Sequence, residues 1–333
     1  MKNKKKKSLA AAVIGILLVA VLGGVAGVLM AKQSRQIEET TEAAEQPPAQ
    51  ENIRDEVTYE GKSYEVNPNL TNILFLGIDK EAEVVVEEVP GNGGQADCVM
   101  ILSLDSETQT GRVLQISRDA MTDVDIYYPN GEFFKSINQQ LCTQYAYGNG
   151  EKSSCWAMEK TVGELLHDLP IHAYLSLNIR SISTLNDLIG GVTLTIPSDY
   201  TYIDPGFVQG AEVTLTGAQA ESYVRYRDTN VTGSNNERMV RQVQYVTALV
   251  DALKAAAGSE EGAYERFSSY LRPYMVTDMD MRQVDEFMNY DFLFEETQFV
   301  PGEAIAGAEF EEFYVDDEKL QEMLIEMFYK PAD

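Results

Sequence analysis

The chain has 333 residues, and 26 lysines and arginines stand against 53 aspartates and glutamates, a formal net charge of -27. This balance excludes a nucleic-acid partner, because a protein binds the phosphates of nucleic acid with a basic face. Hydrophobic residues make up 44% of the chain and aromatic residues 9%, which suffices for a packed core and excludes a wholly disordered protein.

The N-terminal end combines a basic tail with a long apolar run. Residues 1–8 contain five lysines and no acid, and residues 9–31 contain no charged side chain. At about 1.5 Å of rise per residue, a helix of this length can cross a hydrocarbon core of about 30 Å. The lysines place the tail in the cytoplasm and the body outside. We therefore expect a single-pass signal anchor in the cell membrane, with a cleaved signal peptide as the alternative.

Residues 32–66 are rich in Glu, Thr, Ala, Gln and Pro and show no apolar periodicity. This composition predicts a disordered acidic linker. As a random coil, such a linker would hold the body on the order of 30 Å from the bilayer. We therefore expect any substrate at or near the outer surface of the membrane.

Short apolar runs alternate with longer amphipathic runs along the body. Alternating strands and helices predict an α/β protein, here an α-β-α sandwich with a central mixed β-sheet. The expected strands are residues 72–77, 98–104, 112–117, 172–177, 192–196 and about 296–300, and the expected helices are residues 137–147, 155–169, 181–189, 235–257 and 316–329.

The three cysteines leave two possibilities. Cys142 and Cys155 could form a disulfide across a loop outside the cell, which would stabilise the fold by roughly 3 kcal/mol. Cys98 lies in an apolar run and is typical of a core residue. The alternative to the bridge is a set of reduced, buried thiols.

Signatures of the common hydrolases and nucleotide-binding proteins are absent from the sequence. The two histidines, His167 and His172, have no nucleophile motif such as GxSxG beside them, and we expect both to be structural. The sequence contains no Walker A or GxGxxG pattern and no His/Cys spacing typical of zinc sites.

Arginines are more informative. Arg225 and Arg227 would point to one face if the chain between them is extended, and Arg238 and Gln242 are one helical turn apart. Arg118 ends an expected strand. Because guanidinium groups match phosphate oxygens bidentately, these residues suggest a site for a multiply charged anion. The alternative is a set of ion pairs with the abundant carboxylates.

Two aspartates lie at strand ends. Asp79 directly follows the first expected strand, and Asp97 directly precedes the second. Carboxylates in such places suit a divalent ion, and Mg²⁺ is commonly bound together with pyrophosphate oxygens. Turn residues are the alternative interpretation of either aspartate alone.

In this order, the motifs resemble the LytR–CpsA–Psr family of cell-envelope phosphotransferases. Each piece is weak alone, but seven of them in the family's order, behind a basic tail, one apolar run and a linker, are specific. The pieces are NILFLGID (72–79), AD (96–97), ISRD (116–119), Lys135 with IN (137–138), LIGGV (188–192), LTG (215–217) with YVRYR (223–227), and ERMVRQ (237–242).

This resemblance implies a catalytic domain at residues 67–257 and leaves residues 258–333 as a C-terminal α/β extension of unknown role. It implies transfer of an anionic glycopolymer, of teichoic acid or capsule type, from polyprenyl diphosphate to peptidoglycan. The acceptor hydroxyl would attack the phosphorus on the sugar side, and polyprenyl phosphate would leave. The lipid tail would enter an apolar channel between the sheet and the helices.

The resemblance also implies roles for single residues. Asp79 and Asp97 would hold Mg²⁺, and Asp119 would orient an arginine or help to deprotonate the acceptor. The implied catalytic residues are Arg118, Asp119, Arg225 and Arg227, and the implied substrate-binding residues are Arg118, Lys135, Arg225, Arg227, Arg238 and Gln242.

One departure from the family pattern matters. The family usually has Arg-x-Asp before the second strand, where this chain has Gln95-Ala96-Asp97. One diphosphate partner is therefore missing, which Lys80 or Lys135 could replace. Two other functions stay open: a diphosphatase that uses water instead of the sugar hydroxyl, and a non-catalytic lipid-binding or regulatory envelope protein.

Overall fold

In a computed structural model, the structure describes residues 56–128, 132–259, 263–280 and 290–332. The predicted tail and signal anchor (residues 1–8 and 9–31) lie outside the described residues. Within the described ranges, no helix has the length and apolar character needed to traverse a bilayer.

A seven-stranded mixed sheet forms the centre of the fold, in the order β11-β8-β3-β4-β5-β12 with β13 also beside β5. Strand β4 is antiparallel to both of its neighbours, β3 and β5, whereas β8 is parallel to β3. The strands are β3 (Leu70–Ile78), β4 (Ala96–Asp105), β5 (Thr110–Ile116), β8 (Ala173–Asn178), β11 (Met275–Thr277), β12 (Asp291–Phe292) and β13 (Gln298–Phe299).

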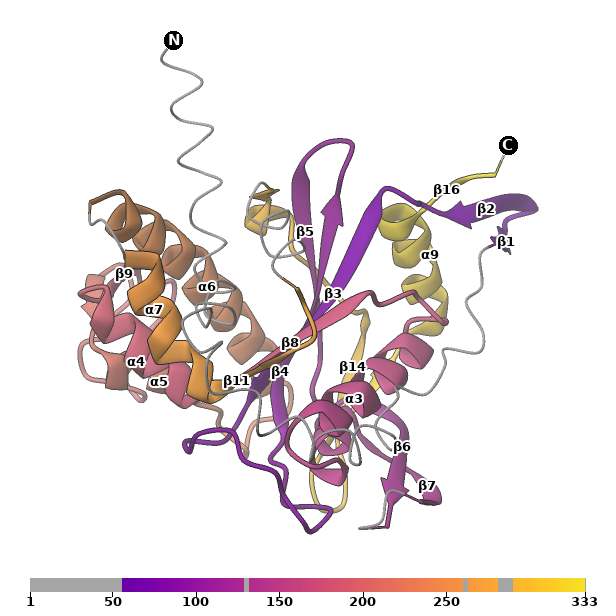
Figure 1. The fold of residues 1–333 in the computed structure, drawn as a ribbon, viewed down its shortest axis with the longest axis horizontal. Coiled ribbons are helices and arrows are strands. Elements are labelled where there is room, and N and C mark those ends of the chain that lie inside the picture. Colours follow the sequence, from indigo (N-terminus) through magenta and orange to yellow (C-terminus); the bar gives the residue numbers. More distant parts are fainter. Residues whose placement is uncertain (1–55, 129–131, 260–262, 281–289, 333) are drawn as a thin grey trace, which may run out of the picture.

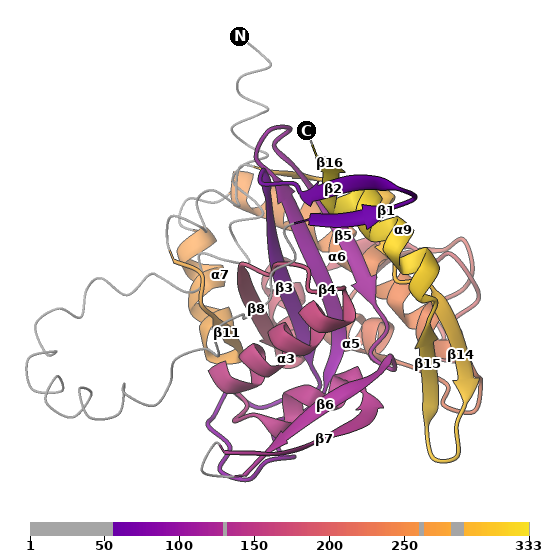
Figure 2. The same ribbon diagram turned by 90° about the vertical axis from the view of Figure 1, so that its right-hand side faces the viewer.

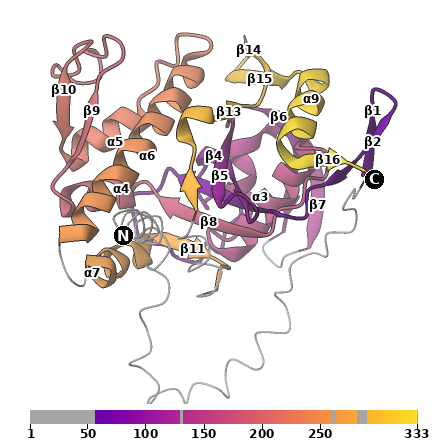
Figure 3. The same cartoon turned by 90° about the horizontal axis from the view of Figure 1, so that it is seen from above.

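Helices cover both faces of this sheet (Figures 1 and 3). Side chains alternate between the faces along a strand, so Ile73 packs into one buried cluster and Leu74 into the other. One face is covered by α4 (Arg180–Leu188), α5 (Gly217–Arg225), α6 (Ser234–Ser259) and α7 (Ala263–Leu271), and the other by α3 (Lys152–Leu165) and α9 (Asp317–Phe328). The predicted α/β sandwich with a mixed sheet is confirmed.

Short antiparallel pairs and single turns complete the fold. The hairpins are β6 (Met121–Tyr127) with β7 (Phe133–Gln140) and β14 (Gly302–Ala306) with β15 (Glu311–Val315), and β9 (Val192–Thr195) pairs with β10 (Glu212–Leu215). The 3-10 turns are η3 (Leu141–Tyr147), η4 (Arg272–Tyr274) and η5 (Phe294–Glu296). Figure 2 shows the β6–β7 hairpin at the end of the molecule opposite β1, β2 and β16.

Two secondary-structure predictions are wrong. Residues 137–140 are strand rather than helix, because Ile137 pairs with Val124 across the hairpin and the chain turns into η3 only at Leu141. Residues 56–66 belong to the fold rather than to a disordered linker. They form β1 (Glu56–Tyr59) and β2 (Lys62–Val66), and β16 (Tyr329–Pro331) adds a third strand beside β2.

The possible disulfide is not formed, since all three cysteines are free. Cys142 lies in η3, and its thiol contacts Gln95 Oε1 at 3.9 Å. Cys155 lies in α3 and packs in the core with Met158. Burial raises the pKa of the Cys142 thiol to about 12, so this group is an uncharged part of the packed interior.

Candidate active site

Three of the predicted residues meet at one edge of the central sheet. Asp79 follows β3, Asp97 is the second residue of β4, and Arg118 lies two residues beyond β5. Because β4 is antiparallel to both neighbours, its beginning lies beside the ends of β3 and β5. We call this place the strand-end edge.

Asp97 accepts hydrogen bonds from two arginines at the strand-end edge. Arg118 Nη1 donates to Asp97 Oδ1, and Arg238 Nη1 donates to Asp97 Oδ2 at 3.1 Å. Arg238 comes from α6 and is only 2% exposed, and this burial lowers the pKa of its guanidinium. Burial alone would also lower the pKa of Arg118, but the neighbouring carboxylates of Asp97, Asp119 and Asp79 raise it.

Gln95 occupies the position at which the family resemblance leads us to expect an arginine. Its side-chain Oε1 accepts from Arg118 Nη2 at 2.6 Å, and its backbone N–H donates to Asp79 Oδ1 at 2.7 Å. Gln95 therefore positions Arg118 by a hydrogen bond but provides no guanidinium group of its own. Lys80 does not take over that position, because its ammonium is paired with Glu87.

Asp119 is fully buried and joins the strand-end edge to the loop after α5. Its carboxylate accepts from Arg227 Nη1 at 2.7 Å and from Gln140 Nε2 at 2.6 Å. The guanidinium of Arg118 lies 3.6 Å away. The buried carboxylate of Asp119 therefore holds Arg227 by a hydrogen bond and lies close to the guanidinium of Arg118, away from solvent.

Glu311 is a residue of this site that the sequence did not reveal. Its Oε1 lies 3.7 Å from Arg227 Nη2, and its Oε2 accepts from the backbone N–H of Gly233 at 2.6 Å. The backbone of β15 supports the same place, since Gln140 Nε2 donates to the Glu311 carbonyl at 2.8 Å. Residues 290–332 thus contribute directly to the site, although no local motif marks them.

Arg225 and Lys135 lie farther from this cluster. Arg225 has a side chain that is 44% exposed and pairs with Glu81 at 3.2 Å and with Glu221 at 3.3 Å. Lys135 is exposed on β7, five residues before Gln140, which corresponds to about 16 Å along a strand. The structure does not bring Lys135 to the strand-end edge.

Arg238 and Gln242 share the face of α6 that is turned toward the sheet, as their spacing predicts. Gln242 Oε1 accepts from Gln115 Nε2 of β5 at 3.2 Å. Arg241 faces elsewhere: it is buried, donates to the Tyr223 carbonyl at 2.8 Å, and lies 5.0 Å from the ring centroid of Tyr200. Arg241 is therefore a packing residue.

Several arginine donors at the site remain unused. Among the described residues, the buried Nε atoms of Arg118, Arg227 and Arg238 have no hydrogen-bond partner. Unsatisfied buried donors carry a free-energy cost that an anion would relieve. The arrangement therefore suits an anion with several oxygens.

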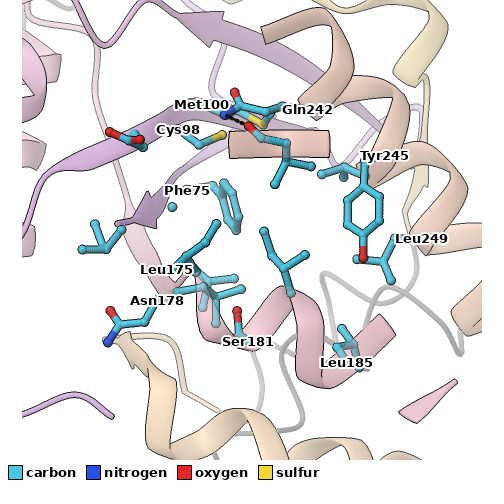
Figure 4. A pocket seen from close by; sticks show the side chains of 18 of the residues that line it. Phe75, Cys98, Met100, Leu175, Asn178, Ser181, Leu185, Gln242, Tyr245 and Leu249 are labelled. Atoms are coloured by element: carbon cyan, nitrogen blue, oxygen red, sulfur yellow. Dashed lines mark hydrogen bonds between the residues drawn. The ribbon is translucent and has the colours of Figure 1, made fainter. Parts of the chain in front are cut away.

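An apolar cavity begins beside these charges and runs between the sheet and helices α4 to α7. It encloses about 1230 Å³, including its open part. Its polar end is formed by Asp79, Asp97, Arg225 and Gln242, and from Asp97 it follows β4 inward to Leu102, about 16 Å along the strand. Figure 4 shows apolar side chains around it, among them Phe75, Met100, Leu175, Leu185 and Leu249.

This cavity lies between the sheet and the helices, where the resemblance implies a channel for a lipid tail, and most of its lining residues are apolar. Asp97 belongs both to its wall and to the arginine cluster, so the charged and apolar parts form one continuous site. The hydrophobic periodicity of the sequence could not predict this cavity, because each lining residue has the pattern of an ordinary core residue in its own strand or helix.

The chain is similar to several curated proteins. It aligns at 24% identity over 326 residues, 96% of each protein, with the polyisoprenyl-teichoic acid–peptidoglycan teichoic acid transferase TagU of Bacillus cereus (strain AH820). The protein of the same name from Bacillus subtilis (strain 168) is 25% identical over 252 residues, 75% of this chain and 72% of the relative.

Solved structures share the fold. A structure described as TagT bound to LI-WTA matches with a TM-score of 0.57 and 21% identity, over 78% of this chain and 89% of that one. The crystal structure of B. subtilis TagU matches with a TM-score of 0.55 and 19% identity, over 78% of this chain and 95% of that one. Both agree with the α/β sandwich described above.

The model of the LytR_cpsA_psr family matches residues 28–324. This range includes the strand-end edge, the cavity and the Glu311 hairpin, and it reaches well beyond the sequence motifs at residues 72–242. The resemblance inferred from those motifs is confirmed: the chain belongs to the LytR_cpsA_psr family.

Proposed function

We propose that the protein is a membrane-anchored, extracytoplasmic phosphotransferase that moves an anionic glycopolymer from polyprenyl diphosphate to peptidoglycan. The observation that carries this proposal is the continuity between the arginine cluster and the apolar cavity at Asp97. A polyprenyl diphosphate joins a multiply charged group to a long hydrocarbon chain, and it needs both environments side by side. The names of the TagU relatives support the same substrates.

In this proposal the diphosphate oxygens take the place that the Asp97 carboxylate holds at Arg118 and Arg238. Arg118 and Arg238 both donate to Asp97, and both have an Nε without a partner. Phosphate oxygens accept such donors bidentately. Gln242 at the polar end of the cavity would lie beside the first isoprene units.

The reaction breaks one P–O bond and forms another. The acceptor hydroxyl oxygen attacks the phosphorus on the sugar side, its proton is released, and the bridging oxygen leaves with the polyprenyl phosphate. Negative charge grows on that bridging oxygen, and guanidinium groups already in place stabilise it without reorganisation. We assign this role to Arg118 and Arg227.

Asp119 is better suited to positioning than to proton transfer. It is fully buried, and both carboxylate oxygens already accept hydrogen bonds from Arg227 and Gln140. A general base must come within reach of the acceptor hydroxyl. We therefore assign Asp119 the role of holding Arg227, with Arg225 at the edge of the site as a weaker substrate contact.

We assign Mg²⁺ to Asp79 and Asp97. Both carboxylates line the polar end of the cavity, and Mg²⁺ is typically held by one or two carboxylates together with substrate phosphates. In the described ranges, no group of three or more His, Cys, Asp or Glu residues could hold a metal. Phosphate oxygens and water would complete the octahedral coordination that Mg²⁺ prefers. When bound, Mg²⁺ supplies charge neutralisation and polarises the phosphoryl oxygens.

The membrane anchor rests on the sequence. Residues 9–31 are uncharged and follow a lysine-rich tail, which favours a span with the N-terminus in the cytoplasm. The family model begins at residue 28, at the end of this run. An anchored domain would meet a donor lipid in the same membrane.

The test uses the full chain in proteoliposomes with polyprenyl-diphosphate glycan, Mg²⁺ and peptidoglycan. We expect covalent transfer of glycan that is lost in Arg227→Ala and after chelation of the metal. Release of glycan phosphate without transfer would instead identify a diphosphatase. Tight binding of the donor without turnover would identify a binding or regulatory protein.

A further inference from the structure

The end of the β6–β7 hairpin carries four aromatic rings in two pairs. Tyr127 and Phe133 have ring centroids 6.0 Å apart, and Tyr128 and Phe134 have ring centroids 4.8 Å apart. Three of the rings are about half exposed: Tyr128 at 48%, Phe133 at 57% and Phe134 at 49%. This is a concentration of apolar surface that a folded protein normally covers or uses.

The two pairs lie on opposite faces of the hairpin. Side chains alternate along a strand, so Tyr127 and Tyr128 point to opposite sides. Tyr127 is paired directly with Phe133, and a register shift between Ile126 and Tyr127 brings Phe134 to Tyr128. A flat ligand, such as a sugar ring, could stack on one face only. A surrounding apolar medium would cover both faces at once.

The hairpin is held firmly behind these rings. Asp125 accepts from Lys160 Nζ of α3 at 2.6 Å and from the Ser136 hydroxyl on the opposite strand. Gln144 of η3 bonds both backbone groups of Asp125, at 2.8 and 3.0 Å. The aromatic end is therefore a projection from a fixed base.

The base of this hairpin is part of the candidate active site. Gln140, the last residue of β7, donates to Asp119, and the aromatic end lies six to seven residues farther along the strand, about 20 Å away. In Figure 2 the hairpin lies at the end of the molecule opposite β1, β2 and β16. The aromatic end thus extends from the same edge as the polar end of the cavity.

We propose that the aromatic end of the β6–β7 hairpin, Tyr127, Tyr128, Phe133 and Phe134, inserts into the outer interface of the membrane. The proposal rests on the proposed function for its membrane setting and for the donor lipid. Tyrosine rings, which carry a polar hydroxyl, favour the interface between headgroups and acyl chains, and phenylalanine rings bury into the acyl side of the same interface. Lys135, whose ammonium lies 5.6 Å from the Phe134 ring centroid, would extend toward the headgroups. Insertion would turn the strand-end edge toward the donor lipid.

Fluorescence quenching tests this contact without requiring enzyme activity. The chain has one tryptophan, Trp156, so the full chain in a Trp156→Phe background allows a single tryptophan to be introduced elsewhere. Phe134→Trp reports on the hairpin end, and Thr108→Trp is the matched control, since Thr108 is exposed in the turn between β4 and β5 at the other end of the sheet. Both variants are reconstituted in nanodiscs of phosphatidylethanolamine and phosphatidylglycerol with brominated acyl chains.

We expect brominated lipid to quench Phe134→Trp strongly and to leave Thr108→Trp unchanged. Equal quenching of the two variants would overturn the proposal. The proposal would also be overturned if brominated lipid did not quench Phe134→Trp and its emission shifted only when peptidoglycan fragments were added. The rings would then bind glycan. Strong quenching in a protein that transfers no glycan would support the membrane contact and count against the proposed function alone.

A second variant links the contact to catalysis. Phe133→Ser with Phe134→Ser removes two exposed rings and leaves the strand-end edge and the cavity intact. We expect slower transfer from a donor embedded in the bilayer and unchanged transfer from a short-chain, water-soluble donor. Equal loss with both donors would mean that the rings support the fold or the site, and it would contradict a role in the membrane.

Discussion

The guanidinium of Arg227 donates to the buried carboxylate of Asp119 at 2.7 Å, although the two residues are 108 positions apart in the chain. Asp119 follows β5, and Arg227 follows α5. Their bond joins the strand-end edge of the central sheet to the loop after α5. A second carboxylate, Glu311 of β15, reaches the other side of the same guanidinium.

Replacement of Arg227 tests whether its fork geometry is required. In Arg227→Lys the charge stays, but the compact ammonium lacks the planar fork that presents separate donors to Asp119 and to a phosphate oxygen in fixed directions. We expect kcat/KM for transfer to fall by about 10²–10³-fold, the usual loss for one electrostatic donor. Arg225→Lys is the control, since the Arg225 side chain is 44% exposed and that of Arg227 only 14%, and a similar loss there would contradict the separate roles.

The Asp119–Arg227 pair also supports the fold. Asp119→Asn keeps the shape but leaves a buried guanidinium with a weaker partner, which we expect to cost about 2 kcal/mol of unfolding free energy. A double-mutant cycle with Arg227→Met measures the coupling by chemical denaturation. Additive effects of the two substitutions would show that the bond adds nothing to stability.

Two substitutions of Glu311 separate its electrostatic effect on donor binding from its effect on the position of the Gly233 loop. Glu311→Gln keeps an acceptor for the Gly233 N–H but removes a negative charge beside Arg227. We expect its KM for the donor to fall a few-fold with little change in kcat. Glu311→Ala also frees the Gly233 loop, and we expect kcat to fall. Steady-state kinetics give kcat and KM for both variants. Identical values for the two variants would contradict an electrostatic effect of Glu311 on donor binding.

The cavity can be blocked from α6. Val246→Trp adds an indole to its wall, whereas Val240→Trp adds the same group to the exposed side of the helix, where Val240 is 50% exposed. We expect the first variant to raise KM several-fold for long-chain donors and to leave short-chain donors unaffected. No dependence on chain length would mean that the lipid tail binds elsewhere.

Stability should depend on pH through Glu159, on the α3 side of the sheet. Burial, with a smaller contribution from Asp278, raises the pKa of Glu159 to about 7. Because the folded protein holds this proton more tightly than the unfolded chain, the stabilising effect is present at acid pH and is lost as the pH rises through about 7. Glu159→Gln stays neutral throughout. It should melt close to the unaltered protein near about pH 5 and higher near about pH 8, and a constant difference would contradict the shift.

Local patterns predicted much of the fold. The apolar run at residues 72–77 forms a strand that places side chains on both faces of the sheet. Arg238 and Gln242 share a face of α6 because residues four apart in a helix lie on the same side. The prediction of a helix at residues 137–147 is wrong for a physical reason. Pairing of Ile137 with Val124 outweighed the local helical pattern.

The site was predicted less completely than the fold. The family resemblance assigned Asp79, Asp97 and Arg118 to one site, and all three lie at the strand-end edge, because β4 begins beside the ends of β3 and β5. Glu311 was missed, since its contact with Arg227 depends on how the β14–β15 hairpin packs and not on any neighbouring residue in the sequence. The aromatic end of β6–β7 was missed for a similar reason, because only the register of the hairpin sets its rings in two pairs.

The central claim is that a sugar hydroxyl, and not water, attacks the diphosphate at this site. The direct measurement is transfer by the full chain in water enriched in ¹⁸O, with mass spectrometry of the glycan phosphate. We predict a phosphodiester to peptidoglycan that contains no ¹⁸O and disappears in Arg227→Ala. A glycan phosphate that carries ¹⁸O and remains unattached to peptidoglycan would contradict the account.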